Sequence, residues 1–167
     1  MTESLFKIER LTTEFVQEED RIRLNIENAQ QGQATLWLTQ RLLNRVVPAL
    51  VKVLEEETSG NPQAAELQAF NQQRAQQGIV QEAPIKAAEQ SWLVCRVDLT
   101  PGKSGVAIVF GDDDGQNARL EMPRIALRQW LSILHELYLR AEWSRDRWPD
   151  WLAPLSETSQ SQSSKLH

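Results

Sequence analysis

Three consecutive carboxylates followed by a glycine, Asp112-Asp113-Asp114-Gly115, are the residues of this sequence best suited to bind a metal ion. Carboxylate oxygens are the hard ligands that Ca²⁺ and Mg²⁺ prefer. A calcium loop of the EF-hand type ends on a glutamate at its twelfth position, where this sequence has Pro123. Asp-Gly also supplies the positive φ that tight hairpin turns require. We therefore expect a solvated turn here and no metal-binding residues.

Three further candidates resemble reactive sites but lack the context that such sites need. Gly102-Lys103-Ser104 resembles the end of a phosphate-binding loop, but Val97 stands where the first glycine of that motif belongs. Cys95 falls on the apolar side of an alternating segment, so we expect it to pack in the core and not to act as a thiolate. His135 has no Ser, Cys or second metal ligand nearby, and we interpret it as a surface or boundary residue.

The motifs of the common enzyme mechanisms are missing from the sequence. It has no His-Glu-x-x-His run, no nucleophile elbow and no glycine-rich dinucleotide turn. An enzyme would have to combine Asp112–Asp114 with His135, and no activated pair is visible among them. We therefore predict that the protein is not an enzyme, with no catalytic residues, no cofactor-binding residues and no cofactor.

Arginine and tryptophan residues concentrate near the C-terminal end of the sequence. Arginines could contact phosphates and tryptophans could stack on bases, so a nucleic-acid-associated accessory protein is the alternative function that we keep open. Carboxylates such as Glu121, Glu136, Glu142 and Asp146 share the segment, which favours a solvated helix face with local ion pairs. The arginines are Arg119, Arg124, Arg128, Arg140, Arg145 and Arg147, and the interleaved tryptophans are Trp130, Trp143 and Trp148.

The same C-terminal segment has more apolar surface than one core needs. Tryptophan and tyrosine are enriched at the centres of protein interfaces. Ile125, Ile133 and Leu139 lie away from the main apolar stripe of the predicted helix, and a helix that is apolar on two sides needs a second surface. We expect Trp148 and Trp151 to dock against the sheet or against a partner chain. The predicted interaction residues are Trp130, Ile133, Tyr138, Trp143, Trp148 and Trp151.

Composition excludes several classes of protein. The chain has 167 residues and a net charge of -5, which is too weak to indicate a partner. Its single cysteine excludes an intrachain disulfide framework. We find no signal peptide and no apolar run approaching the ~18 residues of a membrane helix, so we expect a cytoplasmic protein without membrane contact.

Hydrophobic periodicity predicts the order of the elements. Strands are expected near residues 4–16, 21–27 and 33–38, followed by a helix over 40–57 that Thr39 caps and Pro48 kinks. Residues 58–90 are expected to form a Gln/Ala-rich helical excursion with weak packing. Three strands follow, over 92–99, 106–110 and 117–122, and a helix begins at Pro123. The succession strand-strand-strand-helix thus occurs twice, which is too general to indicate a duplication.

These elements predict an α+β fold, with an antiparallel sheet or open barrel of about six strands, a kinked helix, a helical surface excursion and a long C-terminal helix. Residues 1–155 are expected to form one domain, and the Ser/Gln-rich residues 156–167 a disordered tail. The segments Leu36-Trp37-Leu38-Thr39-Gln40-Arg41-Leu42-Leu43 and Arg124-Ile125-Ala126-Leu127-Arg128-Gln129-Trp130-Leu131 resemble an uncharacterised bacterial domain family, which implies no activity.

The element order over residues 1–143 is also similar to that of the head domains of end-joining scaffold proteins and centriolar cartwheel proteins, which dimerise. No heptads follow Trp143, so no coiled coil is implied and no binding residue is transferred. The sequence therefore predicts a non-catalytic protein interaction or assembly domain, self-associating through its Trp-rich C-terminal helix. Besides a second copy of the chain, an unidentified protein is the other partner we consider, and we do not expect nucleic acid.

Overall fold

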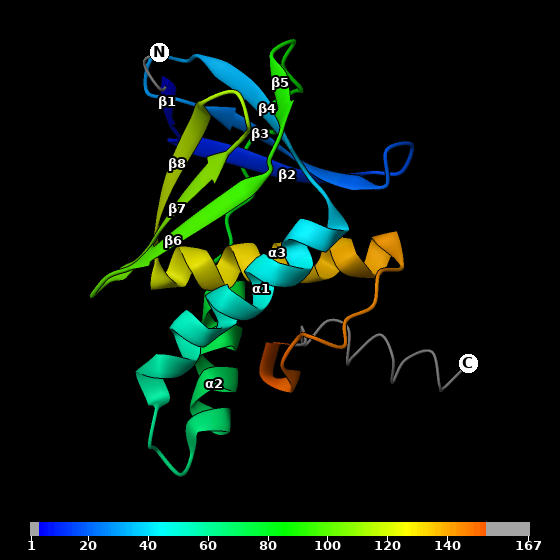
Figure 1. The fold of residues 1–167 in the computed structure, drawn as a ribbon. Coiled ribbons are helices and arrows are strands. Elements are labelled where there is room, and N and C mark those ends of the chain that lie inside the picture. Colours follow the sequence, from blue (N-terminus) through cyan, green and yellow to red (C-terminus); the bar gives the residue numbers. More distant parts are fainter. Residues whose placement is uncertain (1–3, 153–167) are drawn as a thin grey trace.

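A computed structural model describes residues 4–152, which form eight strands, three α-helices and two short 3₁₀ helices (Figure 1). The first half contains β1 (Ser4–Lys7), β2 (Arg10–Val16), β3 (Arg21–Glu27), β4 (Gln33–Leu38) and α1 (Gln40–Glu55). Between the halves lie η1 (Glu56–Thr58) and α2 (Ala64–Gln77). The second half contains β5 (Ser91–Leu93), β6 (Arg96–Pro101), β7 (Gly105–Gly111), β8 (Gln116–Pro123), α3 (Arg124–Ala141) and η2 (Asp150–Leu152).

The strands form two four-stranded sheets. The first sheet has the order β2-β3-β4-β5 and the second sheet the order β1-β8-β7-β6. The predicted α+β class is confirmed, but the prediction of about six antiparallel strands is wrong in detail. Two additional short strands, β1 and β5, pair in parallel with β8 and β4, and the sheets are mixed and not closed into a barrel. Strands of four and three residues are too short to show an alternating pattern in a sequence.

The two halves repeat one plan, in which a short strand, a three-stranded meander and a helix follow one another. In each half the short strand leaves its own meander and pairs with the last meander strand of the other half. Backbone bonds mark both crossings. Ile8 N–H donates to Arg119 O at 2.9 Å and Glu9 N–H to Glu27 O at 2.8 Å, while Val94 N–H donates to Trp37 O at 2.9 Å. The halves are therefore interlocked through their first strands.

The second crossing corrects the sequence-based strand over residues 92–99. The chain leaves the first sheet after Leu93 and enters the second sheet at Arg96. Cys95, at this crossing, donates its N–H to Gly111 O at 2.8 Å, and its side chain is exposed. The inward-facing positions shift by one residue at this crossing, because Trp92 and Val94 pack against the core before it and Val97 and Leu99 after it. The apolar alternation of Leu93, Cys95, Val97 and Leu99 in the sequence hides this shift.

Helices α1 and α3 pack against the inner faces of the sheets and enclose one hydrophobic cluster with them. Thr39 caps α1 as predicted, since its hydroxyl accepts from Leu42 N–H at 3.1 Å. The apolar residues of α1 follow helical spacing, and the helix continues through Pro48 to Glu55. The largest fully buried side chains are Tyr138, Phe110, Ile22, Leu24, Ile26, Leu36, Leu38, Leu43, Leu50, Leu54, Ile108 and Leu127.

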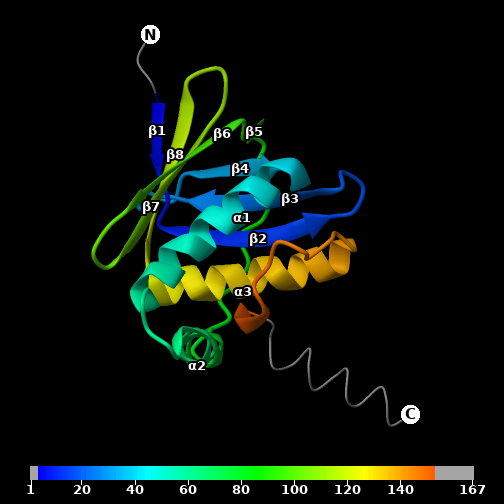
Figure 2. The same ribbon diagram turned by 60° about the horizontal axis from the view of Figure 1, so that its bottom comes forward.

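Helix α2 lies on the side of α1 and α3 that faces away from the strands (Figure 2). Its large apolar side chains, Leu67 and Phe70, are exposed, and its buried face consists of Gln68, Gln72 and Ala75. The interpretation of α2 as a weakly packed excursion overlooked these glutamines. They bond to the neighbouring helices and satisfy their own buried amides, so α2 is attached by polar contacts.

Among residues 4–152 no helix is both long and apolar enough to cross a membrane. The tail predicted to be disordered, residues 156–167, lies outside the described residues.

Candidate functional site

Most of the aromatic residues predicted to form an interface are buried within the chain. Tyr138 is 0% exposed, Trp130 2%, Trp143 7% and Trp148 8%. The ring of Tyr138 packs edge-on against Trp143 and Trp148, with centroid distances of 5.1 and 5.2 Å. In this structure these four side chains stabilise the domain itself and have little surface to offer a second chain.

The polar atoms of these rings also have partners inside the chain. Trp130 Nε1–H donates to Thr13 Oγ1 at 3.0 Å, and Trp143 Nε1–H donates to Asp20 Oδ1 at 2.9 Å. The Tyr138 hydroxyl donates to Asn44 Oδ1 at 2.8 Å. Burial raises the pKa of Tyr138, and the charge of Arg147 acts in the opposite direction. The aromatic cluster therefore joins α3 to β2 and α1 through satisfied hydrogen bonds.

The segment after α3 docks onto the same chain. Trp148 packs against Tyr138 and His135 of α3, so the expected docking is observed against a helix and not against the sheet. Trp151 is partly buried, with the Arg128 guanidinium 5.7 Å from its ring centroid. Ile133 is also only partly buried. Of the predicted interaction residues, Ile133 and Trp151 therefore keep the most exposed surface.

Neither the turn at Asp112–Asp114 nor Cys95 has the surroundings that a metal site or a reactive thiol needs. Asp112 Oδ1 accepts from the N–H groups of Asp114 and Gln116, at 2.9 and 2.8 Å, which closes the β7–β8 turn. The expectation of core packing for Cys95 is wrong, because its side chain is exposed. The pKa of its thiol is raised, first by desolvation and then by the Asp113 carboxylate, so the thiolate is disfavoured. Within the described part of the chain, no three His, Cys, Asp or Glu side chains form a metal-binding group.

His135 corrects another prediction. It is 4% exposed, and its ring packs edge-on against Trp148 at 5.1 Å, so it is neither a surface nor a boundary residue. The sequence places it between an apolar and an acidic residue, and the contact with Trp148 of the segment after α3 could not be read from that pattern.

Arg128 is buried where the sequence predicted a solvated helix face. It donates to Gln68 Oε1 at 2.8 Å, and its guanidinium lies 3.7 Å from Glu57 Oε2. Desolvation lowers the pKa of Arg128, and Glu57 partly opposes this effect. Arg124 also pairs with Glu57, at 2.7 Å. These two arginines attach η1 and α2 to α3 and are engaged within the chain.

The outer face of the first sheet is covered by an extended part of the chain, residues 81–90, which we call the covering segment. Its backbone bonds to side chains of the sheet. Ile85 N–H donates to Thr12 Oγ1 at 2.9 Å and Ala88 N–H to Thr35 Oγ1 at 2.8 Å, while Asn25 Nδ2–H donates to Ile85 O at 2.9 Å. Neutral polar residues of β2, β3 and β4 thus bind a peptide backbone irrespective of most of its side chains.

Two features fix the covering segment in place. The Ile85 side chain is 5% exposed, whereas its neighbours in the segment are mostly exposed. Asn25, which is 0% exposed, also accepts from the Thr35 hydroxyl at 2.9 Å, so its amide is held in one orientation. Arg10 bonds to Glu82 and to Ala83 O at the start of the segment. One apolar anchor and a preorganised set of polar groups therefore hold an extended peptide on this face.

The second sheet has an equivalent outer face with different residues. We call three outward-facing residues that are paired across neighbouring strands a rung. In the first sheet the rungs across β2, β3 and β4 are Arg10–Glu27–Gln33, Thr12–Asn25–Thr35 and Glu14–Arg23–Trp37. The corresponding rungs of the second sheet are Arg96–Gly111–Asn117, Asp98–Val109–Arg119 and Thr100–Ala107–Glu121. Charged residues at the sides and small residues in the middle replace the polar residues that hold the covering segment.

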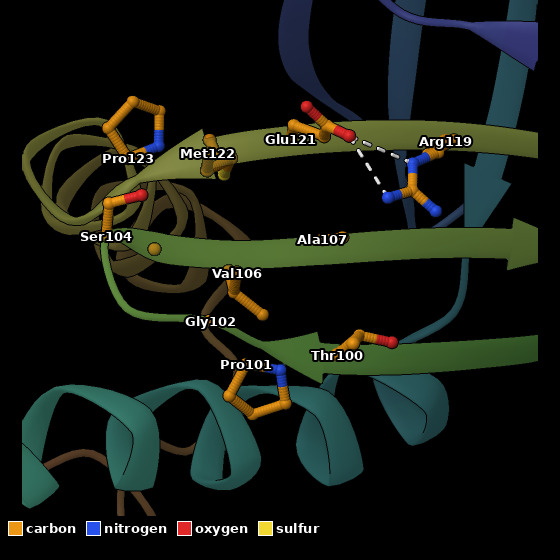
Figure 3. A pocket seen from close by; sticks show the side chains of 11 residues that line it. Thr100, Pro101, Gly102, Ser104, Val106, Ala107, Arg119, Glu121, Met122 and Pro123 are labelled. Atoms are coloured by element: carbon orange, nitrogen blue, oxygen red, sulfur yellow. Dashed lines mark hydrogen bonds and ion pairs between the residues drawn. The ribbon is translucent and has the colours of Figure 1, made fainter.

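The small residues of β7 form the floor of a depression of about 480 Å³ on this outer face (Figure 3). Thr100 and Pro101 of β6 lie on one side of β7, and Arg119 and Glu121 of β8 lie on the other. Arg119 and Glu121 form an exposed ion pair at 3.0 Å. Ala107 lies between the two sides, and we call this depression the β7 trough.

The lining of the β7 trough shows no arrangement of groups typical of catalysis. Its polar side chains are a threonine, a serine and one ion pair, without an activated nucleophile or base in hydrogen-bond contact. The alternation of β6, β7 and β8 in the sequence locates this face, but it does not reveal that no segment among residues 4–152 covers it. No family model matches the chain, and the searches among curated proteins and among solved structures found no match.

Proposed function

We propose that this protein is a non-catalytic protein-interaction domain that binds an extended segment of a partner protein along the β7 trough. One observation supports the proposal above all others: the equivalent face of the first sheet already binds an extended peptide, the covering segment. The first sheet shows that an extended chain fits across such a face, and because the second sheet lacks the rung Thr12–Asn25–Thr35, the residues of the β7 trough would have to hold the ligand there.

The residues of the trough suggest how such a segment would be held. Gly105 and Ala107 of β7 leave room above the strand for one apolar side chain, between Pro101 and Pro123. Arg119 and Glu121, the exposed ion pair on the β8 side of the trough, would contact charged side chains of the ligand. The ligand expected from this arrangement is an extended peptide with an apolar residue flanked by residues of both charges.

The nucleic-acid alternative finds less support. It relied on Trp130, Trp143 and Trp148 for base stacking, and all three are buried. The charges around the trough are of both signs, whereas a phosphate backbone requires a predominantly positive surface. We therefore place the peptide first and make nucleic acid an outcome of the test.

The decisive experiment selects extended peptides from a displayed random library and measures their affinity by fluorescence anisotropy. Ala107→Arg fills the trough with a long charged side chain and should weaken binding by about tenfold or more, which is about 1.4 kcal/mol. Gln33→Arg introduces the same side chain at an exposed outward position of the first sheet and should leave the affinity unchanged.

Two results would overturn the proposal. One is a library that yields no binding peptide, and the other is binding that Ala107→Arg leaves intact. Tight binding of a single-stranded oligonucleotide that Ala107→Arg abolishes would assign the trough to the alternative function instead.

A further inference from the structure

A second candidate site lies at the beginning of α1, away from the residues of the β7 trough. Arg41 and Arg45 of α1 meet Arg147 of the segment after α3 around a depression of about 540 Å³. Gln40 and Asn44 complete its lining, so every side chain around it is polar and three are cationic. The segment carrying Arg147 is held against α3 by the burial of the neighbouring Trp148.

The arginines of this cluster lack the carboxylate partners that other arginines of the chain have. Within residues 4–152, Arg41, Arg45 and Arg147 form no ion pair, although the chain has a net charge of -5. Arginines with a carboxylate partner are Arg10, Arg23, Arg96, Arg119, Arg124 and Arg128. The positive charge at this site is therefore not neutralised by the described part of the chain.

The location of the cluster is also unfavourable for cations. The first turn of α1 contains no acidic residue and carries Arg41, although the partial positive charge of a helix N-terminus favours anions there. Arg41 and Arg45 are four positions apart on one helix, where like charges repel each other. An anion bound between them would relieve both effects.

Neutral groups at the site can act as hydrogen-bond donors. Asn44 Oδ1 accepts from the Tyr138 hydroxyl at 2.8 Å, which directs the Asn44 oxygen toward the tyrosine and leaves its amide N–H groups for a ligand. The Arg147 charge acts on the pKa of Tyr138, so Arg147 lies near this pair. A partly buried hydrogen bond thus orients the Asn44 side chain at the site.

We propose that Arg41, Arg45 and Arg147 bind the phosphate groups of a small polyphosphorylated ligand. Arginine forms paired hydrogen bonds with phosphate oxygens, and a helix N-terminus adds favourable backbone dipoles. The lining has no apolar wall for a base or an acyl chain, so recognition falls on the phosphates themselves. Three cationic groups match a diphosphate or triphosphate better than a single phosphate.

Isothermal titration calorimetry of the full chain with inorganic phosphate, pyrophosphate and tripolyphosphate tests the proposal. Affinity should rise in that order and fall with added salt. Arg41→Ala, Arg45→Ala and Arg147→Ala should each weaken tripolyphosphate binding by about tenfold. Lys52→Ala removes one positive charge from an exposed position of the same helix and should have little effect.

ATP and tripolyphosphate distinguish the two sources of the phosphates. Equal affinities that depend on the three arginines would support recognition of phosphates alone, and tighter ATP binding would support a nucleotide as the natural ligand. The absence of saturable tripolyphosphate binding would overturn the proposal, as would equal weakening by Lys52→Ala and the three arginine variants. Binding of a single-stranded oligonucleotide without binding of tripolyphosphate would also overturn it, in favour of a nucleic acid. Circular dichroism of each variant verifies that the fold is retained.

Discussion

The first and second sheets share one succession of strands, yet within residues 4–152 only the first has its outer face covered by the chain. The central rung of the first sheet is Thr12–Asn25–Thr35, and all three side chains bond to the covering segment or to each other. The same rung of the second sheet is Asp98–Val109–Arg119. Equal topology therefore does not imply equal use of a sheet face, because the outward side chains decide what the face can hold.

The middle strands differ as much as the central rungs. Strand β3 carries Arg23, Asn25 and Glu27 on its outward side, whereas β7 has glycines at both ends. A Cβ atom at Gly105 would lie 1.9 Å from Met122 O, so β7 approaches β8 too closely there for any side chain. The depth of the β7 trough thus depends on Gly105, which the packing of β7 against β8 requires.

The largest effect is expected from Gly105→Ala. The added methyl group meets backbone atoms of Met122 and Pro123, which cannot move without breaking the β7–β8 pairing. Unfolding in urea should show a loss of about 3 kcal/mol. Gly102→Ala, in the adjacent loop, meets no atom closer than 3.9 Å and should change stability by less than about 0.5 kcal/mol. Similar stabilities of the two variants would show that β7 and β8 are not so closely packed.

An intermediate effect is expected when the central residues of β3 and β7 are exchanged. Asn25→Val removes the side-chain donor to Ile85 O and the acceptor of the Thr35 hydroxyl proton, which should cost about 2 kcal/mol. Val109→Asn places a polar side chain on an exposed face and should cost no more than about 1 kcal/mol. Chemical denaturation of both variants measures the difference. Equal costs would mean that the covering segment adds nothing to stability.

Regular periodicity made a large part of the fold predictable. The alternation in β3 and β4, the helical spacing in α1 and α3 and the Thr39 cap all follow from local rules that the structure obeys. The crossings at Ile8 and Val94 could not be predicted, because each shifts the inward-facing positions by one residue within a continuous extended chain, so that Ile8 is followed by Leu11 and Val94 by Val97. The packing of helix α2 was underestimated because its buried face consists mainly of glutamines, which add no periodic apolar pattern to the sequence.

The candidate sites were less predictable than the fold. The sequence pointed to tryptophans as interaction residues, but Trp148 and its neighbours satisfy the core of their own chain. The covering segment has no regular pattern, and its role depends on contacts between residues more than 50 positions apart, such as Thr35 with Ala88. The arginine cluster likewise joins α1 to a segment that follows it by about a hundred residues. Local patterns do not contain such contacts.

The smallest effect is expected from Thr12→Val, which removes the acceptor of the Ile85 N–H and preserves the shape of the side chain. One lost hydrogen bond of about 1 kcal/mol corresponds to about a fivefold increase in the opening of the covering segment. Residues 81–90 have no helix or strand of their own, so we expect them to open as one unit. Amide hydrogen exchange should therefore accelerate about fivefold at both Ile85 and Ala88, although Ala88 is bonded to Thr35. The amides of β7 belong to the uncovered second sheet and should exchange as before. Faster exchange at Ile85 alone would show that each contact of the segment opens independently, and faster exchange in β7 would show that the two sheets unfold together.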